Sequence, residues 1–178
     1  MKMPKSPVSN ASWFRKAILP VTLGCAASLY ADNNFWVAEG PAPWMEDANW
    51  SLGFVPTAAD VAIIENGGAA TVSEDYEITV ANLRLVDGSL SMSGGSITNT
   101  SDIMRIGDYA LSGQEGTVNF SMSNSDSDAP ASLSAVGRLY IADGNGNSST
   151  VSTVNMTLSG DSVITNENDY IVIGRQGG

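Results

Sequence analysis

Short runs rich in apolar and β-forming residues, most of them with polar residues at alternate positions, recur along the chain from about residue 61 onward. Turn-forming Gly, Asn, Asp and Ser residues separate these runs. Strands of roughly four to six residues with turn signals between them are typical of an all-β protein. No long stretch with the helical period follows the N-terminal segment, so we predict an all-β fold. Five runs show the pattern: Val61–Ile64, Glu77–Val80, Leu83–Val86, Thr117–Phe120 and Thr153–Met156.

One segment of the chain repeats itself without a gap. Ile97–Gly107 recurs as Ile164–Gly174, with six of its eleven positions identical. Weaker copies of its second half lie at Leu83–Val86 and Leu139–Ala142. Repetition at a period of about 20–50 residues indicates stacked structural units. The first aligned residues of the four copies, spaced by 21, 35 and 32 residues, are Leu83, Met104, Leu139 and Ile171.

A second strand shows the same relation. Thr117–Phe120 and Thr153–Met156 lie 36 residues apart, and we align Ser89–Met92 with them as an earlier copy. One unit cannot bury its apolar face alone, but stacked units share a continuous core, which favours a β-solenoid. Because side chains alternate along a strand, we predict inward positions for Met104, Ile106, Val118 and Phe120, and outward positions for Arg105 and Asn119.

The N-terminal segment, residues 1–31, has the layout of a secretory signal peptide. Its apolar run, Ala17–Ala27, is too short to span a bilayer, which takes about 20 apolar residues. Small residues then lead to Ala31, where we predict cleavage, with Ala27 as the alternative site. A buried N-terminal helix is the competing interpretation. The run follows four cations and no acid: Lys2, Lys5, Arg15 and Lys16.

Residues 32–60 form a Trp-rich lead, which we predict to be an N-terminal cap on repeats that occupy residues 61–178. Trp36, Trp44 and Trp50 lie here, and no Trp follows. Aromatic side chains bury large areas and would cover the open end of the first unit. The alternative is that Trp36, Trp44 and Trp50 bind glycans by stacking on sugar rings.

The net charge and the residue types that are absent limit the kinds of partner and of catalytic group that this protein can have. Removal of residues 1–31 would change the formal net charge from −11 to −15 and leave a chain with no Lys, no His and four arginines. Such a surface repels nucleic acid and anionic lipid, so we predict that neither is a partner. We also predict no integral membrane segment in the chain after the signal peptide is removed. The only cysteine, Cys25, lies in the signal, which excludes a disulfide or a thiolate nucleophile from the exported part.

The sequence resembles bacterial secreted and surface proteins with autotransporter-like parallel β-helix repeats, of the pectin-lyase-like β-solenoid type. The resemblance rests on Asn49–Pro56 in the Trp-rich lead, on Leu90–Ile97 with its Ser-Gly-Gly, and on two Ile-Gly steps that end at Gly107 and Gly174. It covers roughly residues 36–178 and implies a right-handed parallel β-helix. A β-sandwich is the alternative, because short strands between turns also describe that fold.

The signal peptide predicts that the protein is exported. The resemblance implies a place outside the cell or on its surface and, as partner, a polysaccharide or a host or cell-surface ligand. The repeats stop after the step at Gly174 with no polar cap, so we predict that they are truncated at the C-terminus, where similar proteins carry an outer-membrane attachment. Lyases of this fold use an acidic Ca²⁺ site and a Lys or Arg base. The exported part has no Lys, and we expect its four arginines to occupy different registers of the repeat.

A candidate metal site lies at Asp143, Asn145 and Asn147, which have the opening spacing of a Ca²⁺-binding loop. Ser148 then replaces the usual Gly and Val154 the usual bidentate Glu, and an Asn- and Gly-rich turn explains the segment equally well. We therefore predict no cofactor, with Ca²⁺ at this loop as the alternative. The aspartates that follow the aligned strand are interpreted as corner residues: Asp87, Asp108 and Asp143.

No Gly-rich phosphate loop, nucleophile elbow or metal-ligand signature occurs in the sequence. We therefore expect a secreted or cell-surface structural or adhesive passenger without catalytic activity. The alternative is a carbohydrate-active protein on the same fold, either a polysaccharide lyase or hydrolase or a glycan-binding module.

Overall fold

The computed structural model describes residues 31–74, 76–101, 103–108, 116–124, 130–143 and 153–174, without the side chains of residues 108 and 143. Residues 1–30 of the predicted signal peptide, with Cys25 among them, lie outside these ranges. Apart from one 3₁₀ turn, η1 (Asp47–Asn49), the elements are strands, which confirms the all-β prediction. Among the described residues, no helix has the length and apolar character needed to cross a membrane.

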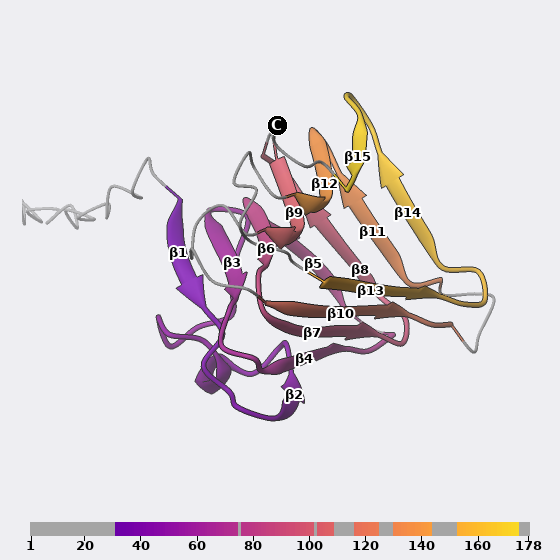
Figure 1. The fold of residues 1–178 in the computed structure, drawn as a ribbon. Coiled ribbons are helices and arrows are strands. Elements are labelled where there is room, and N and C mark those ends of the chain that lie inside the picture. The colour runs from indigo at the N-terminus through magenta and orange to yellow at the C-terminus, as the bar shows by residue number, and fades with distance from the viewer. Residues whose placement is uncertain are drawn as a thin grey trace, which may run out of the picture.

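The strands are divided among three sheets (Figure 1). The first has the order β1 (Asp32–Phe35), β3 (Asp60–Ile64), β6 (Asn82–Leu85), β9 (Ile103–Asp108), β12 (Arg138–Asp143) and β15 (Ile171–Ile173). The second has the order β2 (Pro41–Pro43), β4 (Ala69–Val72), β7 (Gly88–Met92), β10 (Thr117–Met122) and β13 (Thr153–Leu158). The third has the order β5 (Glu77–Val80), β8 (Ser96–Asn99), β11 (Ser132–Ala135) and β14 (Val163–Asn166).

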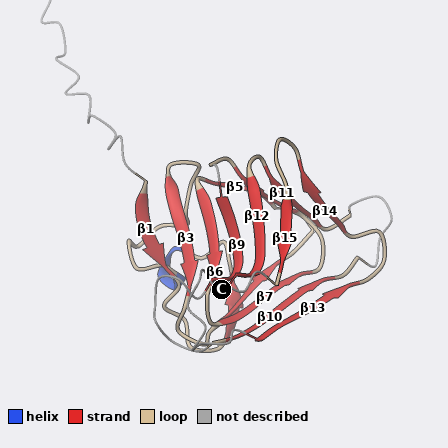
Figure 2. Cartoon of the chain, turned by 45° about the horizontal axis from the view of Figure 1, so that its top comes forward, coloured by secondary structure: helices blue, strands red, loops and turns tan. Residues whose placement is uncertain are grey.

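From β3 onward the chain visits the three sheets in rotation, so that each set of three strands lies on the set before it. Figure 2 shows the resulting stack, with the strands of each sheet side by side. All pairings between the named strands are parallel, and an isolated antiparallel bridge joins Trp36 to Trp50. Because the sheets of a β-sandwich are antiparallel, this pairing does not fit the alternative fold.

The strand registers confirm the main sequence alignment. Leu139 pairs with both Met104 and Ile171, as the repeat predicts. Thr117–Phe120 likewise pairs with Thr153–Met156. The predicted alignment of Ser89–Met92 with Thr117–Phe120 was wrong by two residues, because Leu90 of β7 pairs with Phe120 rather than with Val118. A shift of two keeps the same side chains inward, so the apolar pattern alone does not distinguish the two registers.

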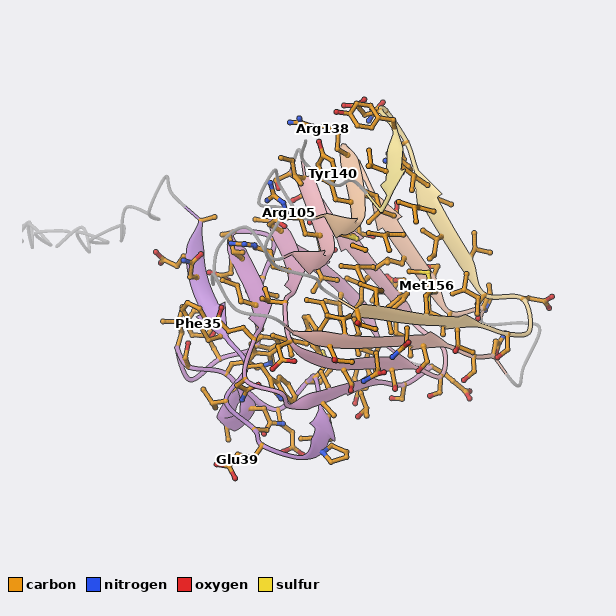
Figure 3. The ribbon with its side chains drawn as sticks, viewed as in Figure 1. Phe35, Glu39, Arg105, Arg138, Tyr140 and Met156 are labelled. Carbon is orange, nitrogen blue, oxygen red and sulfur yellow. The ribbon has the colours of Figure 1, made fainter. Side chains whose placement is uncertain are left out.

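The core runs along the stack between the sheets and contains the inward residue of nearly every strand. Met104, Ile106, Val118 and Phe120 are each at most 1% exposed, so the predicted inward positions are confirmed. Met156 points into the same interior from β13 (Figure 3). Asn119, between Val118 and Phe120, is exposed, as alternation requires.

The Ile-Gly steps have a conformational reason. Gly107 and Gly174 have φ of 77° and 69°, in the left-handed region that glycine enters without a Cβ penalty. Ala142 follows Ile141, which pairs with Ile106, and it also has a positive φ of 56°. A non-glycine residue pays about 1–2 kcal/mol for that conformation. The weaker copy therefore keeps the repeat's backbone geometry without its glycine.

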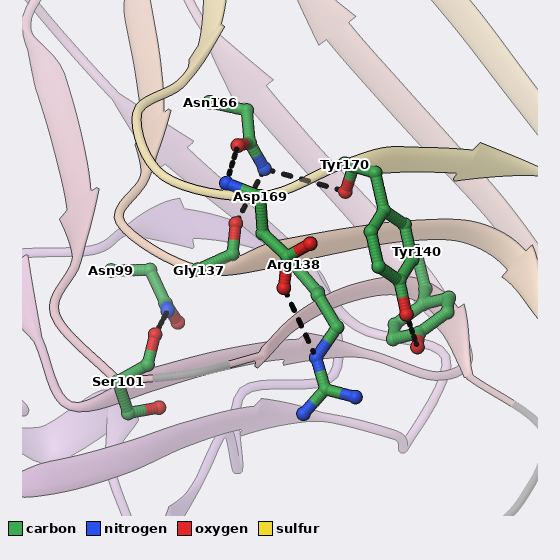
Figure 4. A network of polar contacts seen from close by, with 8 residues as sticks. All are labelled: Asn99, Ser101, Gly137, Arg138, Tyr140, Asn166, Asp169 and Tyr170. Carbon is green, nitrogen blue, oxygen red and sulfur yellow. Dashed lines mark hydrogen bonds and ion pairs between the residues drawn. The ribbon is translucent and has the colours of Figure 1, made fainter.

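Two asparagines in the repeated Ile-Thr-Asn triplets connect the end of a unit to its start. Asn99 is fully buried, and its Oδ1 accepts a hydrogen bond from the Leu83 amide at 2.8 Å. Asn166, at the corresponding position two units later, donates from Nδ2 to the Gly137 carbonyl (Figure 4). Each asparagine thus links the third strand of a unit to the beginning of its first strand.

Candidate functional site

The three tryptophans of the lead pack together at the first end of the stack. Trp36, Trp44 and Trp50 are at most 2% exposed. The Trp50 ring lies 5.1 Å from that of Trp36 and 4.7 Å from that of Trp44, both in edge-on geometry, which aromatic pairs favour. Trp50 Nε1 also donates a 2.8 Å hydrogen bond to the Trp44 carbonyl. Protein atoms already cover these rings, so a sugar would have to displace a neighbour before stacking on them.

The loop that carries Trp50 is attached to β1 by a buried asparagine. Asn34 Nδ2 donates to the Phe54 carbonyl at 2.8 Å, and its Oδ1 accepts from the Leu52 amide at 3.1 Å. Asp47 accepts a 2.9 Å hydrogen bond from the Val55 amide, so this carboxylate also holds the loop. These contacts support the cap interpretation of the lead. The sequence pattern did not single out Asn34, because a polar residue in a strand gives no sign of burial.

The candidate Ca²⁺ loop lies largely outside the described residues. Asn145 and Asn147 are not described, and of Asp143 only the backbone is, in register with Asp108. The side chain of Asp87 accepts a 3.1 Å hydrogen bond from the Thr117 amide, which is the corner role predicted for it. Within the described part of the chain, no group of three or more His, Cys, Asp or Glu residues is placed to hold a metal ion.

The arginine side chains of the described strands lie together on the outer face of the first sheet. Arg84 and Arg105 are direct cross-strand partners, and Arg105 is in turn the partner of Tyr140. The expectation that all arginines occupy different registers is therefore wrong for this pair, since both follow the aligned apolar residue. Like charges on opposite strands destabilise a sheet unless other groups balance them. The Arg105 guanidinium lies 5.8 Å from the centre of the Tyr140 ring, within cation–π distance.

A polar network continues this face toward the last strands (Figure 4). Arg138 Nε lies 3.8 Å from an Asp169 carboxylate oxygen, and both side chains are partly exposed. The Tyr140 and Tyr170 hydroxyls are 3.3 Å apart. That hydrogen bond, together with burial, raises the pKa of Tyr140 above its ordinary value of 10.0, against the opposing effect of Arg138. Tyr140 is therefore a neutral hydrogen-bonding group at physiological pH.

The outer faces of the other two sheets are different in chemistry. Their exposed columns consist almost wholly of small hydroxyl and amide side chains, and Ser91 and Ser121 hydrogen-bond across strands at 2.9 Å. Asn155 donates to Asn119 in the same way at 3.0 Å. The second sheet contributes the exposed or half-buried Thr71, Ser89, Ser91, Thr117, Asn119, Ser121, Thr153, Asn155 and Thr157; the third contributes Thr79, Ser96, Thr98, Ser132, Ser134 and Thr165. The exposed exceptions lie on the outermost strands: Pro41, Pro43, Glu77 and Val163.

A cleft of about 330 Å³ lies between the cap loop and the free edge of β5. Its walls are mostly apolar, with Met45, Val55 and Ile78 among them, and Glu77 is its one ionisable group. A lone carboxylate supplies neither the acid–base pair of glycoside hydrolysis nor a nucleophile with its base. The cleft therefore offers packing surface and no recognisable catalytic chemistry.

No protein-family profile, no curated protein and no solved structure matches this chain.

Proposed function

We propose that this chain is an exported parallel β-helix that acts as a structural or adhesive scaffold and does not catalyse a reaction. The observation that carries the proposal is the pair of outer faces on which most outward side chains are small hydroxyl and amide groups. These groups both donate and accept hydrogen bonds, and they introduce almost no charge on the faces. A regular polar face with Glu77 as its one outward charge is suited to lie against an extended ligand surface.

The β-helix itself is supported by three features of the stack. The strands rotate through three parallel sheets, and each set of three pairs with the next. The Asn99 and Asn166 hydrogen bonds connect the end of a unit to its own beginning. One apolar core extends through all the units. A continuous core with nearest-neighbour packing is what stacked repeats require for stability.

Several carboxylates have structural uses, which supports the non-catalytic proposal. Asp47 and Asp87 accept backbone hydrogen bonds, as above, and Asp60 accepts from both the amide and the hydroxyl of Thr57 at 2.8 and 2.7 Å. Carboxylates engaged in this way stabilise turns rather than exchange protons with a substrate.

The proposal is tested on the exported chain with a glycan array and with turnover assays on neutral and uronic-acid polysaccharides, each with CaCl₂ and with EDTA. We expect no release of reducing ends or unsaturated sugars under either condition. We expect retention on neutral glycans, weakened at least tenfold by Ser91→Asp with Ser121→Asp, which place charge on one face. Any turnover contradicts the non-catalytic proposal, and no retention on any glycan contradicts glycan adhesion.

A second candidate, binding of acidic glycans, is favoured by one observation. Arg105, Arg138 and Tyr170 gather around the buried Tyr140 on the outer face of the first sheet, where guanidinium groups pair with carboxylates and the 48% exposed Tyr170 ring stacks on a sugar face. In the same array, this function predicts retention on uronic-acid glycans that Tyr170→Ala abolishes and the Ser91→Asp, Ser121→Asp variant leaves intact.

A further inference from the structure

Two tyrosines on successive units of the stack meet through their hydroxyl groups. The Tyr140 and Tyr170 oxygens lie 3.3 Å apart, and the ring centres are 6.3 Å apart at an interplanar angle of 86° (Figure 4). Tyr140 lies in β12, and Tyr170 immediately precedes β15, which pairs with β12. The ring carbons ortho to a hydroxyl are bonded to the carbon that bears it. The contact therefore brings an ortho carbon of each ring close to the other ring.

The two rings differ in their access to solvent. Tyr140 is 4% exposed, whereas Tyr170 is 48% exposed. The Arg105 guanidinium also lies 5.8 Å from the centre of the Tyr140 ring. A cation that is attracted to the electrons of a ring makes the loss of an electron from that ring less favourable. An oxidant in solution therefore reacts first with Tyr170, and reaches Tyr140 only through it.

The exposure of Tyr170 is a property of its register in the repeat. Tyr170 aligns with Arg138, because the residues that follow them, Ile171 and Leu139, are cross-strand partners. Arg138 lies in β12, between β9 and β15, and its side chain is still 29% exposed. A side chain at this corner thus stays open to solvent when units lie on both sides of it.

We propose that Tyr140 and Tyr170 form an oxidative cross-linking site, at which a carbon–carbon bond between the two rings joins successive units covalently. The co-reactant is a one-electron oxidant, of the class that a haem peroxidase provides from hydrogen peroxide. A link of this kind is open to a chain whose predicted exported part has no cysteine and so forms no disulfide.

The hydroxyl contact provides the path by which both rings are oxidised. Tyr170 first gives an electron to the oxidant and its hydroxyl proton to water, which leaves a phenoxyl radical. This radical takes the hydroxyl hydrogen atom of Tyr140 across the 3.3 Å contact, and a second oxidation restores the radical at Tyr170.

The two radicals then couple at ring carbons ortho to their oxygens. The hydrogens on those carbons pass through water to the oxygens, so both phenols are restored. Two electrons and two protons leave the protein in all, and they reduce one hydrogen peroxide to two waters. The product is a dityrosine within one chain.

The bond would fasten the last described unit to the unit before it. In a stack where each unit contacts only its neighbours, a unit near an end is held from one side. The two tyrosines are 30 residues apart in the sequence, so the bond closes a long loop. A covalent link of that kind limits the unfolded chain and stabilises the folded one, as a disulfide does. We therefore expect cross-linking to raise the urea midpoint of unfolding.

The test treats the exported chain with a haem peroxidase and limiting hydrogen peroxide, at a protein concentration low enough to make encounters between copies rare. A parallel reaction uses a small oxidant, photogenerated ruthenium(III) with persulfate, which does not have to dock on the protein. We expect the monomer to lose the mass of two hydrogen atoms and to show dityrosine fluorescence. Peptide mapping by mass spectrometry is expected to place the link between Tyr140 and Tyr170.

Two variants identify the site. Tyr170→Phe, which keeps the ring and removes only its hydroxyl, is expected to lower the dityrosine yield of the monomer at least tenfold with unchanged circular dichroism. Tyr76→Phe is the matched control, because Tyr76 is 37% exposed and no tyrosine among the described residues lies against it. It is expected to leave the yield unchanged.

No cross-link with either oxidant overturns the proposal. So does a dityrosine that maps only to another pair, or a yield that Tyr76→Phe lowers and Tyr170→Phe does not. A chain linked between Tyr140 and Tyr170 whose urea midpoint does not rise contradicts the stabilising role of the bond.

Discussion

Replacing Trp50 by alanine is expected to lower the free energy of unfolding by about 4–5 kcal/mol, the upper part of the range for a buried Trp or Phe. Trp50 is 2% exposed and lies between the other two rings of the cap. The substitution removes both ring contacts and leaves the Trp44 carbonyl without its 2.8 Å donor. Since a domain is stable by only about 5–15 kcal/mol, we expect a large fall in the midpoint of urea unfolding.

Two variants separate the contributions to this loss. Phe54→Ala, in the same loop but 41% exposed, is expected to cost less than about 1 kcal/mol. Trp50→Phe keeps a ring and loses only the donor, so its effect should lie between those of the two alanine variants. If Trp50→Ala leaves unfolding unchanged and abolishes retention on a glycan array, the cap interpretation fails and the sugar-stacking alternative is correct.

Replacing Phe120 by alanine is expected to cost about 3–5 kcal/mol. Phe120 is 1% exposed and lies in the core between the registers of Leu90 and Met156. Units on both sides fix the space around it, so the structure can close only part of the cavity that the ring leaves. Equilibrium unfolding in urea, followed by circular dichroism, measures the loss.

The control for Phe120 is its neighbour on the same strand. Asn119→Ala changes an exposed side chain on the opposite face and removes a hydrogen bond with Asn155. Net hydrogen bonds of this kind contribute about 0.5–1.5 kcal/mol, and less at an exposed position, so we expect a change below about 1 kcal/mol. Equal effects at the two positions would contradict the alternation of inward and outward side chains on β10.

Much of the fold follows from repetition in the sequence. The gapless match of Ile97–Gly107 with Ile164–Gly174 aligned residues that the structure stacks, and alternation identified the core side chains of β9 and β10. The position of Ser89–Met92 was wrong because a shift of two residues preserves the apolar pattern. Only the length of the corner before β7 determines that register, and corner length is not visible in the alternation.

The chemistry of the surface was harder to predict. Arg84 and Arg105 share a register, and this follows from the same alignment that placed Leu83 over Met104. Tyr170 precedes Ile171, which pairs with Leu139, so the repeat alignment places it beside Arg138 and diagonal to Tyr140. The contact between the two hydroxyls depends on the side-chain conformations, which the alignment does not give. Burial of the tryptophans was anticipated by the cap hypothesis, but their mutual packing depends on the path of the loop held by Asn34.

The central claim, that successive units stack in this register, is tested most directly by an engineered disulfide. Ser91 and Ser121 are cross-strand partners with hydroxyls 2.9 Å apart, and adjacent strands are spaced at about 4.8 Å, within the range that a disulfide bridges. The chain's only cysteine, Cys25, lies ahead of the described residues and is replaced by serine in the test protein. Ser91→Cys with Ser121→Cys is predicted to oxidise to an intrachain bridge, read by mass spectrometry of non-reduced peptides. Ser91→Cys with Asn119→Cys, a diagonal pair beyond about 7 Å, is predicted to stay reduced. No bridge in the first pair, or an equally ready bridge in the second, would contradict the stacked fold.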